Sequence, residues 1–384
     1  MPADVESKKE RQEGVMKVHF LISAVLALCL NVTPLFAQNQ ARSPAWETVV
    51  EAAKKEGKVV VSMPSSADLR KSFEATFKQR FGIQVESVVA RGSASVRKIA
   101  EEARAGVRYF DVHMGGSESI VSGLLPEGIL DPVANSFLLP EVKDPKNWWG
   151  GHIWTDKAKK LIYTSLAYST ENIWYNGELI RPEEIRSFDD LLDEKWKGKM
   201  GFLDPRSPGS GASLWSYLRE IKGEEFLKKL ASQKLVLGRD QRVLAESVAK
   251  GRLTLVMGLT YYTFAPFVKA GLPVRPLPTP KEGVYISGGS GHFIVMKNSP
   301  HPNATKVFTN WFLGREGQDL FSRAMGQGTR RLDVNTKWLS EVGVTAAKDV
   351  YSPEEYAKRE NNSEEKVERV REPGAALARQ LLGQ

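Results

Sequence analysis

The prediction of the fold starts from GKMGFLDPRSPGSGASLWSY, Gly198–Tyr217. Its first part, Met200–Leu203, is a short apolar run typical of a buried strand. From Leu214 onward apolar residues recur at helical spacing, and the run before it, Ser207–Ser213, is small and glycine-rich. The stretch therefore predicts a strand, a tight turn and the N-terminal end of a helix. Such an end presents unpaired N–H groups and a positive dipole end, which together suit an anion.

Two interpretations of this turn stay open. In the first, Ser210 or Ser213 is the N-cap of an ordinary helix. In the second, the turn holds a bound anion, and its candidate residues are Arg206, Ser210, Gly211, Ala212 and Ser213. Because an acidic residue suits a first helical turn, we expect Gly211→Asp to block an anion there while the fold survives.

Length and composition indicate a globular protein of two lobes. The chain has 384 residues, more than one compact domain usually holds, with 41% hydrophobic and 26% charged residues. Its net charge is +8, but lysine and arginine alternate with acidic residues and form no basic block interleaved with aromatics. This pattern argues against a nucleic-acid partner. A diffuse positive field instead favours the attraction of small anions.

The N-terminus has the pattern of an export signal. A short basic segment, Met16–His19, precedes an apolar run, Phe20–Leu30, and Ala37 is a small residue at a suitable cleavage point. We predict a leader over residues 1–37, with the signal proper from about Met16, and a mature protein in the periplasm. The only cysteine, Cys29, lies in the apolar run, so the mature chain would have no thiol for disulfides, catalysis or metal binding.

The first third of the chain alternates strands with helices. Three β-branched or apolar runs each end in small polar residues before an amphipathic segment. This rhythm predicts an α/β protein with open sheets, whose ligands lie beyond the carboxyl ends of the strands. The candidate binding residues at these three ends are Ser66, Ser93, Gly116 and Ser117.

The rest of the chain repeats this rhythm in a second region. Leu253–Gly258 is a buried-type strand that delivers Tyr261 and Tyr262, and a shorter strand precedes Gln241. We expect the chain to cross between lobes in Ile162–Tyr175 and again in Leu272–Ser287. The predicted divisions are 44–165 with 285–333 for lobe 1, 166–284 for lobe 2, and 334–384 for a C-terminal helical segment. Within it the tail after Val350 is charged, and we expect it to be helical as far as Pro373 and to form a solvated face and not a binding element.

Several motifs in this order resemble one known family. They are Trp196–Gly201, Asp204-Pro205-Arg206, Ser210-Gly211-Ala212, Tyr261-Tyr262 with Lys269-Ala270-Gly271, the serine–glycine run after Ser287, Pro302-Asn303-Ala304 with Phe308 and Trp311, and Arg315–Gln318. Over roughly Trp46–Asp333 the chain resembles the periplasmic solute-binding proteins of ABC importers, in the branch of the ferric-iron-binding proteins. The resemblance implies a type 2 periplasmic-binding fold, in which two α/β lobes, each a mixed open sheet flanked by helices, are joined by two hinge strands.

The resemblance also implies roles for single residues. In the iron-binding members a Ser-Gly-Ala at a helix N-terminus holds a companion anion, assisted by an amide that Gln241 matches, and two tyrosines bind ferric iron as phenolates. Tyr261 and Tyr262 match these tyrosines. The family's histidine is replaced by Ser65 or Ser66, and its glutamate falls near Gly116, with Glu118 two residues on. Two tyrosines alone are a poor donor set for a hard ferric ion. An aromatic wall with hydroxyl donors is the interpretation that we favour.

Three functional hypotheses follow. The first is a binding protein that captures a small anionic solute, a carboxylate or phosphate ester, by closing two lobes around it, and delivers it to a membrane permease. The second is ferric iron bound through Tyr261 and Tyr262 with a synergistic anion. The third is an enzyme on a similar fold, which we disfavour because no nucleophile with a paired base and no nucleotide-binding fingerprint occurs. We expect a monomer without a resident cofactor.

Overall fold

The computed structural model describes residues 44–89, 92–170 and 172–383. The chain divides into two units, Met1–Glu47 and Thr48–Gln384. Of the first unit only the beginning of helix α2 (Pro44–Glu56) is described, so the predicted export signal lies outside the described residues. All the sheets described below belong to the second unit. Within the described part of the chain, no helix is long and apolar enough to span a bilayer.

The first sheet has the strand order β2-β1-β3-β13-β4, and β5 also pairs with β13. Its strands are β1 (Lys58–Met63), β2 (Gln84–Val89), β3 (Val112–Gly115), β4 (Leu130–Asp131), β5 (Tyr163–Thr164) and β13 (His292–Met296). Strands β1, β2 and β3 are parallel, whereas β13 runs antiparallel to β3. The carboxyl ends of β1, β2 and β3 therefore meet at one edge of the sheet.

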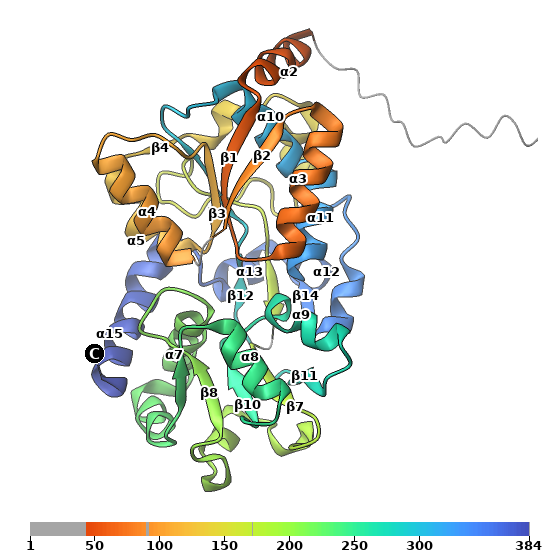
Figure 1. Ribbon diagram of the computed structural model, residues 1–384. Helices are drawn as coiled ribbons and strands as arrows, with labels where there is room; N and C mark the ends of the chain where they lie inside the picture. Colours follow the sequence, from red (N-terminus) through yellow and green to blue (C-terminus); the bar gives the residue numbers. More distant parts are fainter. Residues whose placement is uncertain (1–43, 90–91, 171, 384) are drawn as a thin grey trace, which may run out of the picture. The chain divides into compact units, whose positions relative to one another are not determined.

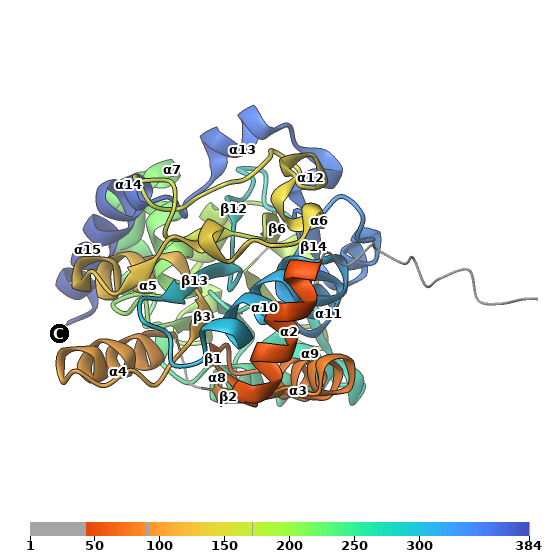
Figure 2. The same ribbon diagram turned by 90° about the horizontal axis from the view of Figure 1, so that it is seen from above.

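Helices cover both faces of this sheet. They are α3 (Ala67–Phe81), α4 (Gly92–Arg104), α5 (Ser117–Gly123), α10 (Pro302–Leu313) and α11 (Arg315–Met325). Figures 1 and 2 show α4 and α5 on one side of the strands and α3, α10 and α11 on the other. On that side Phe73 packs edge-on against Phe308 and Trp311, with ring centroids 6.2 and 4.9 Å apart. We call this sheet with its helices lobe 1.

The second sheet has the order β11-β7-β10-β8-β9. Its strands are β7 (Ile173–Asn176), β8 (Met200–Leu203), β9 (Val236–Gly238), β10 (Leu255–Met257) and β11 (Val274–Pro276), and its helices are α7 (Ser210–Ser232), α8 (Gln241–Ala249) and α9 (Tyr261–Lys269). Strands β8, β9 and β10 are parallel, so their carboxyl ends also share an edge. We call this sheet with its helices lobe 2. Its core includes Phe202 and Trp215, whose rings meet edge-on at 5.8 Å.

A third, three-stranded sheet has the order β12-β6-β14, with β6 (Tyr168–Thr170), β12 (Ile286–Ser287) and β14 (Val344–Ala346). Along the chain β6 lies between β5 of lobe 1 and β7 of lobe 2, and β12 lies between β11 of lobe 2 and β13 of lobe 1. The chain thus passes twice between the lobes through this sheet. Each passage is a series of short strands and not one continuous strand.

The C-terminal segment differs from two predictions, a helical segment over 334–384 and a solvated face after Val350. After η7 (Lys337–Val342) it contributes strand β14 to the third sheet, and then forms α12 (Ala347–Val350), α13 (Pro353–Arg359), α14 (Glu364–Lys366), the π-helix η8 (Val367–Arg371) and α15 (Glu372–Leu382). Helix α15 packs on α7, where a Cβ atom on Gly374 would lie 2.2 Å from Ser216 Oγ. Leu377 and Ala378 belong to the lobe 2 core. The segment is therefore an integral part of the packing.

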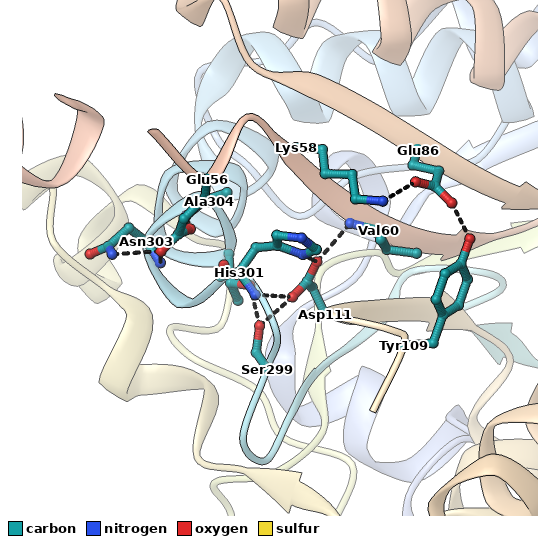
Figure 3. A network of polar contacts seen from close by, with 11 residues as sticks. Glu56, Lys58, Val60, Glu86, Tyr109, Asp111, Ser299, His301, Asn303 and Ala304 are labelled. Atoms are coloured by element: carbon teal, nitrogen blue, oxygen red, sulfur yellow. Dashed lines mark hydrogen bonds and ion pairs between the residues drawn. The ribbon is translucent and has the colours of Figure 1, made fainter. Parts of the chain in front are cut away.

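A buried polar network ties the amino ends of the lobe 1 strands (Figure 3). Its centre is Asp111, the residue before β3, which is fully buried. The Asp111 carboxylate accepts hydrogen bonds from Val60 N at 2.7 Å and from His301 N and Nδ1 at 2.9 and 2.8 Å, and Ser299 Oγ donates to it as well. One side chain thus holds β1, β3 and the loop before α10 together.

Candidate functional site

The lobe 1 candidates lie at one sheet edge, as their position after parallel strands requires. Ser66 follows β1 as the N-cap of α3, and its hydroxyl accepts from Leu69 N at 3.2 Å. Ser93 lies in the first turn of α4 after β2, and Gly116 is the N-cap of α5 after β3. Ser117, the first residue of α5, is buried. All four residues therefore lie at helix N-terminal ends that follow the parallel strands of lobe 1.

The lobe 2 candidates centre on the N-terminal end of α7, which no side chain of the described residues caps. Its N-cap is Gly209, so the predicted N-cap at Ser210 or Ser213 is wrong. The Ser210 hydroxyl instead donates to Gly258 O at 2.6 Å, and the Ser213 hydroxyl donates to Gly209 O at 3.1 Å. The backbone N–H groups of Ser210, Gly211 and Ala212 find no acceptor among the described residues.

Close backbone packing explains why glycines occur in this turn. A Cβ atom on Gly211 would lie 2.1 Å from the carbonyl oxygen of Leu203 at the end of β8. Gly258, after β10, has φ +84°, and a Cβ atom there would lie 2.7 Å from Gly211 Cα. The expectation that Gly211→Asp leaves the fold intact is therefore wrong, because any side chain at 211 collides with backbone. Glycine here allows the end of β8, the start of α7 and the residue after β10 to touch.

Gln241, Tyr261 and Tyr262 lie at the same edge. The Tyr262 hydroxyl donates to Gln241 Oε1 at 2.8 Å, and Thr263 Oγ1 donates to the same oxygen at 3.1 Å. The Tyr261 ring packs on Gly326, which ends α11 in lobe 1, since a Cβ atom there would lie 2.2 Å from Tyr261 Cδ1. Tyr261 thus makes a contact between the lobes, and the Tyr262 hydroxyl is a hydrogen-bond donor to Gln241.

Arg206 is engaged in an ion pair. Its Nε and Nη2 atoms donate to the two carboxylate oxygens of Asp204 at 2.7 and 2.9 Å. Burial alone raises the pKa of Asp204, but hydrogen bonds from Arg206 and Arg239 lower it to about 2. Arg206 Nη1 also donates to Gly383 O at 3.0 Å, just after α15. The predicted ligand residue therefore fixes the turn and the C-terminal helix.

A second arginine reaches the site from the C-terminal segment, which the sequence analysis did not indicate. Arg371, the last residue of η8, is 4% exposed and forms an ion pair with Glu118, which is equally buried. Its Nη2 atom lies 3.2 Å from Gly209 O, and its Nη1 atom lies 3.5 Å from Ser117 Oγ. The guanidinium therefore touches the N-terminal ends of both α5 and α7.

Tyr261, Tyr262 and Gln241 bring phenol and amide oxygens to the site, and Glu118 brings a carboxylate that is paired with Arg371. Among residues 44–89, 92–170 and 172–383, no three His, Cys, Asp or Glu side chains are grouped so that they could hold a metal ion. Burial lowers the pKa of His113 to about 4 and that of His292 to about 3, so both imidazoles are neutral at physiological pH. His113 Nδ1 pairs with Ser62 Oγ at 2.8 Å, which is a structural contact.

Comparison with known proteins identifies the family. A model of the family described as bacterial extracellular solute-binding protein matches residues 62–319, more than half of the chain. The chain therefore belongs to this family. The iron uptake protein A1 of Synechocystis sp. (strain ATCC 27184 / PCC 6803 / Kazusa) is 24% identical over 217 residues, which cover 51% of this chain and 55% of that relative. The matched part thus spans about half of the curated relative.

Solved structures show the same fold. Iron-bound HitA from Pseudomonas aeruginosa matches with a TM-score of 0.63 and 18% identity over 85% of this chain and 99% of that one. The periplasmic binding protein AfuA from Actinobacillus pleuropneumoniae, with exogenous fructose-6-phosphate bound, matches with a TM-score of 0.61 and 19% identity over 84% and 99% of the chains. These likenesses confirm the predicted two-lobed fold.

Proposed function

We propose that this protein is the solute-binding component of an ABC importer, which captures a small carboxylate or phosphate ester and delivers it to a membrane permease without chemical conversion. The observation that carries the proposal is the uncapped N-terminal end of α7. The N–H groups of Ser210, Gly211 and Ala212 there have no acceptor among the described residues, and the Ser210 hydroxyl donates to Gly258 O. Unpaired N–H groups and the helix dipole together favour an anion.

The proposed solute contacts come from both lobes. They are Ser66, Ser93, Gly116 and Ser117 in lobe 1, and Ser210, Gly211, Ala212, Ser213, Gln241, Tyr261 and Tyr262 in lobe 2. In this proposal residues 44–165 and 285–333 form lobe 1, residues 166–284 form lobe 2, and the mature chain begins near Gln38 in the periplasm. A solute that touches both lobes makes all its contacts only in the closed form, so its binding shifts the population toward closure.

Ferric iron is the second candidate solute, because the adjacent tyrosines of α9 supply two phenol oxygens at the same edge. Two observations favour the organic anion. The Tyr262 hydroxyl is a donor to Gln241, and Glu118, the carboxylate next to the family's glutamate position, is paired with Arg371. Ferric binding would need both tyrosines deprotonated and further anionic oxygen donors.

Native mass spectrometry of the protein exported by a bacterial host tests the proposal. We expect a mature chain that begins near Gln38 and retains an organic anion that denaturation releases. A chain recovered in the cytoplasm with Met1 or Met16 would contradict export. A retained ferric ion, or an uncharged organic solute, would contradict the proposed solute class.

The purified protein is expected to stay colourless in the presence of ferric citrate. Ferric–phenolate coordination gives a visible charge-transfer band, and the described residues offer the tyrosines no group of three His, Cys, Asp or Glu side chains that could complete an iron site. The measurement is a visible absorption spectrum of the wild type and of the double variant Tyr261→Phe/Tyr262→Phe. A strong band that appears in the wild type and disappears in the double variant would establish ferric iron as the solute.

Ser210→Ala should weaken anion binding by only about 1 kcal/mol, because it removes one neutral hydrogen bond and leaves the backbone N–H groups in place. The lost bond is the one from Ser210 Oγ to Gly258 O. Calorimetric titration with citrate and with inorganic phosphate measures the effect. Ser232→Ala, which removes a hydroxyl at the other end of α7, is the matched control and should bind as the wild type does. Complete loss of binding in Ser210→Ala would mean that the hydroxyl carries recognition.

A further inference from the structure

The C-terminal segment brings one buried positive charge to the proposed anion site. Arg371 ends the π-helical turn η8, directly before α15, and Figure 1 shows α15 beside α7. Helix α15 is fixed on α7 by the close approach of Gly374 to Ser216, and Glu372 accepts a hydrogen bond from Ser122 Oγ of α5 at 3.0 Å. The position of the guanidinium is therefore set by packing on both lobes.

The hydrogen bonds of this guanidinium are incomplete. A guanidinium has five N–H donors. The Nη atoms contact Glu118, Gly209 O and Ser117 Oγ, but the buried Nε–H has no acceptor in the described part of the chain. An unsatisfied buried donor on a charged group is costly, so a missing partner is the expected reason for it. The missing partner would be an acceptor.

The surroundings indicate an anionic acceptor. Gly209, whose carbonyl Arg371 contacts, is the N-cap of α7, and the next three N–H groups also lack acceptors among the described residues. A fork of guanidinium donors beside a helix N-terminus matches the oxygens of a carboxylate or a phosphate group. Among the ion pairs of the described residues, Arg371 is paired with Glu118.

We propose that Arg371 binds the anionic group of the solute, and that Glu118 is the internal counter-ion that holds the guanidinium in place when no solute is bound. The proposal rests on the function proposed above and names the residue that selects negative charge. Solute binding places a second anion beside Glu118. The two anions repel each other, so Glu118 lowers the affinity for the solute while it positions Arg371.

The competing explanation is a purely structural ion pair that docks the C-terminal segment. The two explanations predict different effects of Glu118→Gln on the affinity for the anion. If Arg371 binds the solute, Glu118→Gln removes a repelling charge and tightens anion binding. If the pair is only structural, Glu118→Gln lowers stability and leaves the affinity for the anion unchanged.

The test is calorimetric titration of the full mature chain with inorganic phosphate and with citrate, together with thermal unfolding of each variant. Arg371→Met alone would leave a buried carboxylate unpaired and endanger the fold. The decisive variant is therefore Glu118→Gln/Arg371→Met, compared with Glu118→Gln. Arg369→Met is the matched control, because Arg369 lies in the same turn, is exposed, and pairs with Glu365 at 3.0 Å.

We expect Glu118→Gln to bind at least one of the two anions more tightly than the wild type. Adding Arg371→Met should then weaken binding about 10- to 100-fold, as the loss of a charge-assisted hydrogen bond does. Arg369→Met should bind as the wild type does. Equal affinity of Glu118→Gln and the double variant would overturn the role of Arg371 and leave the proposed function standing. Failure of the wild type to bind either anion would overturn both.

Discussion

Gly211→Ala is expected to destabilise the fold by about 3 kcal/mol, although it adds a single methyl group. The added carbon would lie 2.1 Å from the carbonyl oxygen of Leu203 and 3.0 Å from its Cβ atom. Both neighbours are anchored in the lobe 2 core, so the strand end or the helix start must move. Urea-induced unfolding followed by circular dichroism measures the loss.

Gly116→Ala is the matched control. Gly116 also precedes a helix at the proposed ligand edge, but its φ is −77° and a Cβ atom there has no neighbour within 4 Å. We expect its stability to stay within about 0.5 kcal/mol of the wild type. Equal stabilities of the two variants would contradict the close contact of β8, α7 and β10. For the same steric reason Gly211→Asp is expected to destabilise the fold, so a loss of binding in that variant would not by itself identify the anion site.

The strand and helix at the start of lobe 2 could be predicted because each depends on the pattern of residues close together in the sequence. The apolar run Met200–Leu203 is strand β8, and the helical spacing after it belongs to α7, which begins at Ser210. Small residues after parallel strands also placed the lobe 1 candidates at one sheet edge. The predicted N-cap of α7 was wrong. Gly209, Ser210 and Gly211 are adjacent small residues, and their sequence does not show at which of them the helical backbone begins.

Long-range pairing limited the rest of the prediction. Strand β14 has three residues, too few for a periodicity, and its extended form follows from pairing with β6. Arg371 stands in a charged run in which Arg369 looks equivalent, yet one is buried at the site and the other is exposed. Arg206, a predicted ligand residue, instead pairs with Asp204. Sequence alone places charges along the chain but does not show which of them meet.

Asp111→Ala is the other change with a large expected effect, a loss of about 3–5 kcal/mol of folding free energy. The Asp111 carboxylate is fully buried and accepts hydrogen bonds from Val60 N, Ser299 Oγ and two nitrogens of His301 (Figure 3). Alanine leaves the buried Val60 N without this acceptor and removes the carboxylate from Ser299 and His301, which are partly exposed. It also releases the loop before α10 from β1 and β3.

Glu86→Ala is the matched control in the same view. Glu86 is partly exposed and pairs with Lys58 at 2.7 Å, so its removal should cost about 1 kcal/mol or less.

Below its lowered melting temperature, Asp111→Ala should bind the same anion with unchanged affinity, because Asp111 precedes β3 while the proposed contacts follow the carboxyl ends of the strands. Thermal unfolding and calorimetric titration of both variants separate the two effects. A stable Asp111→Ala protein with lost binding would mean that this network, and not the opposite edge, supports the site.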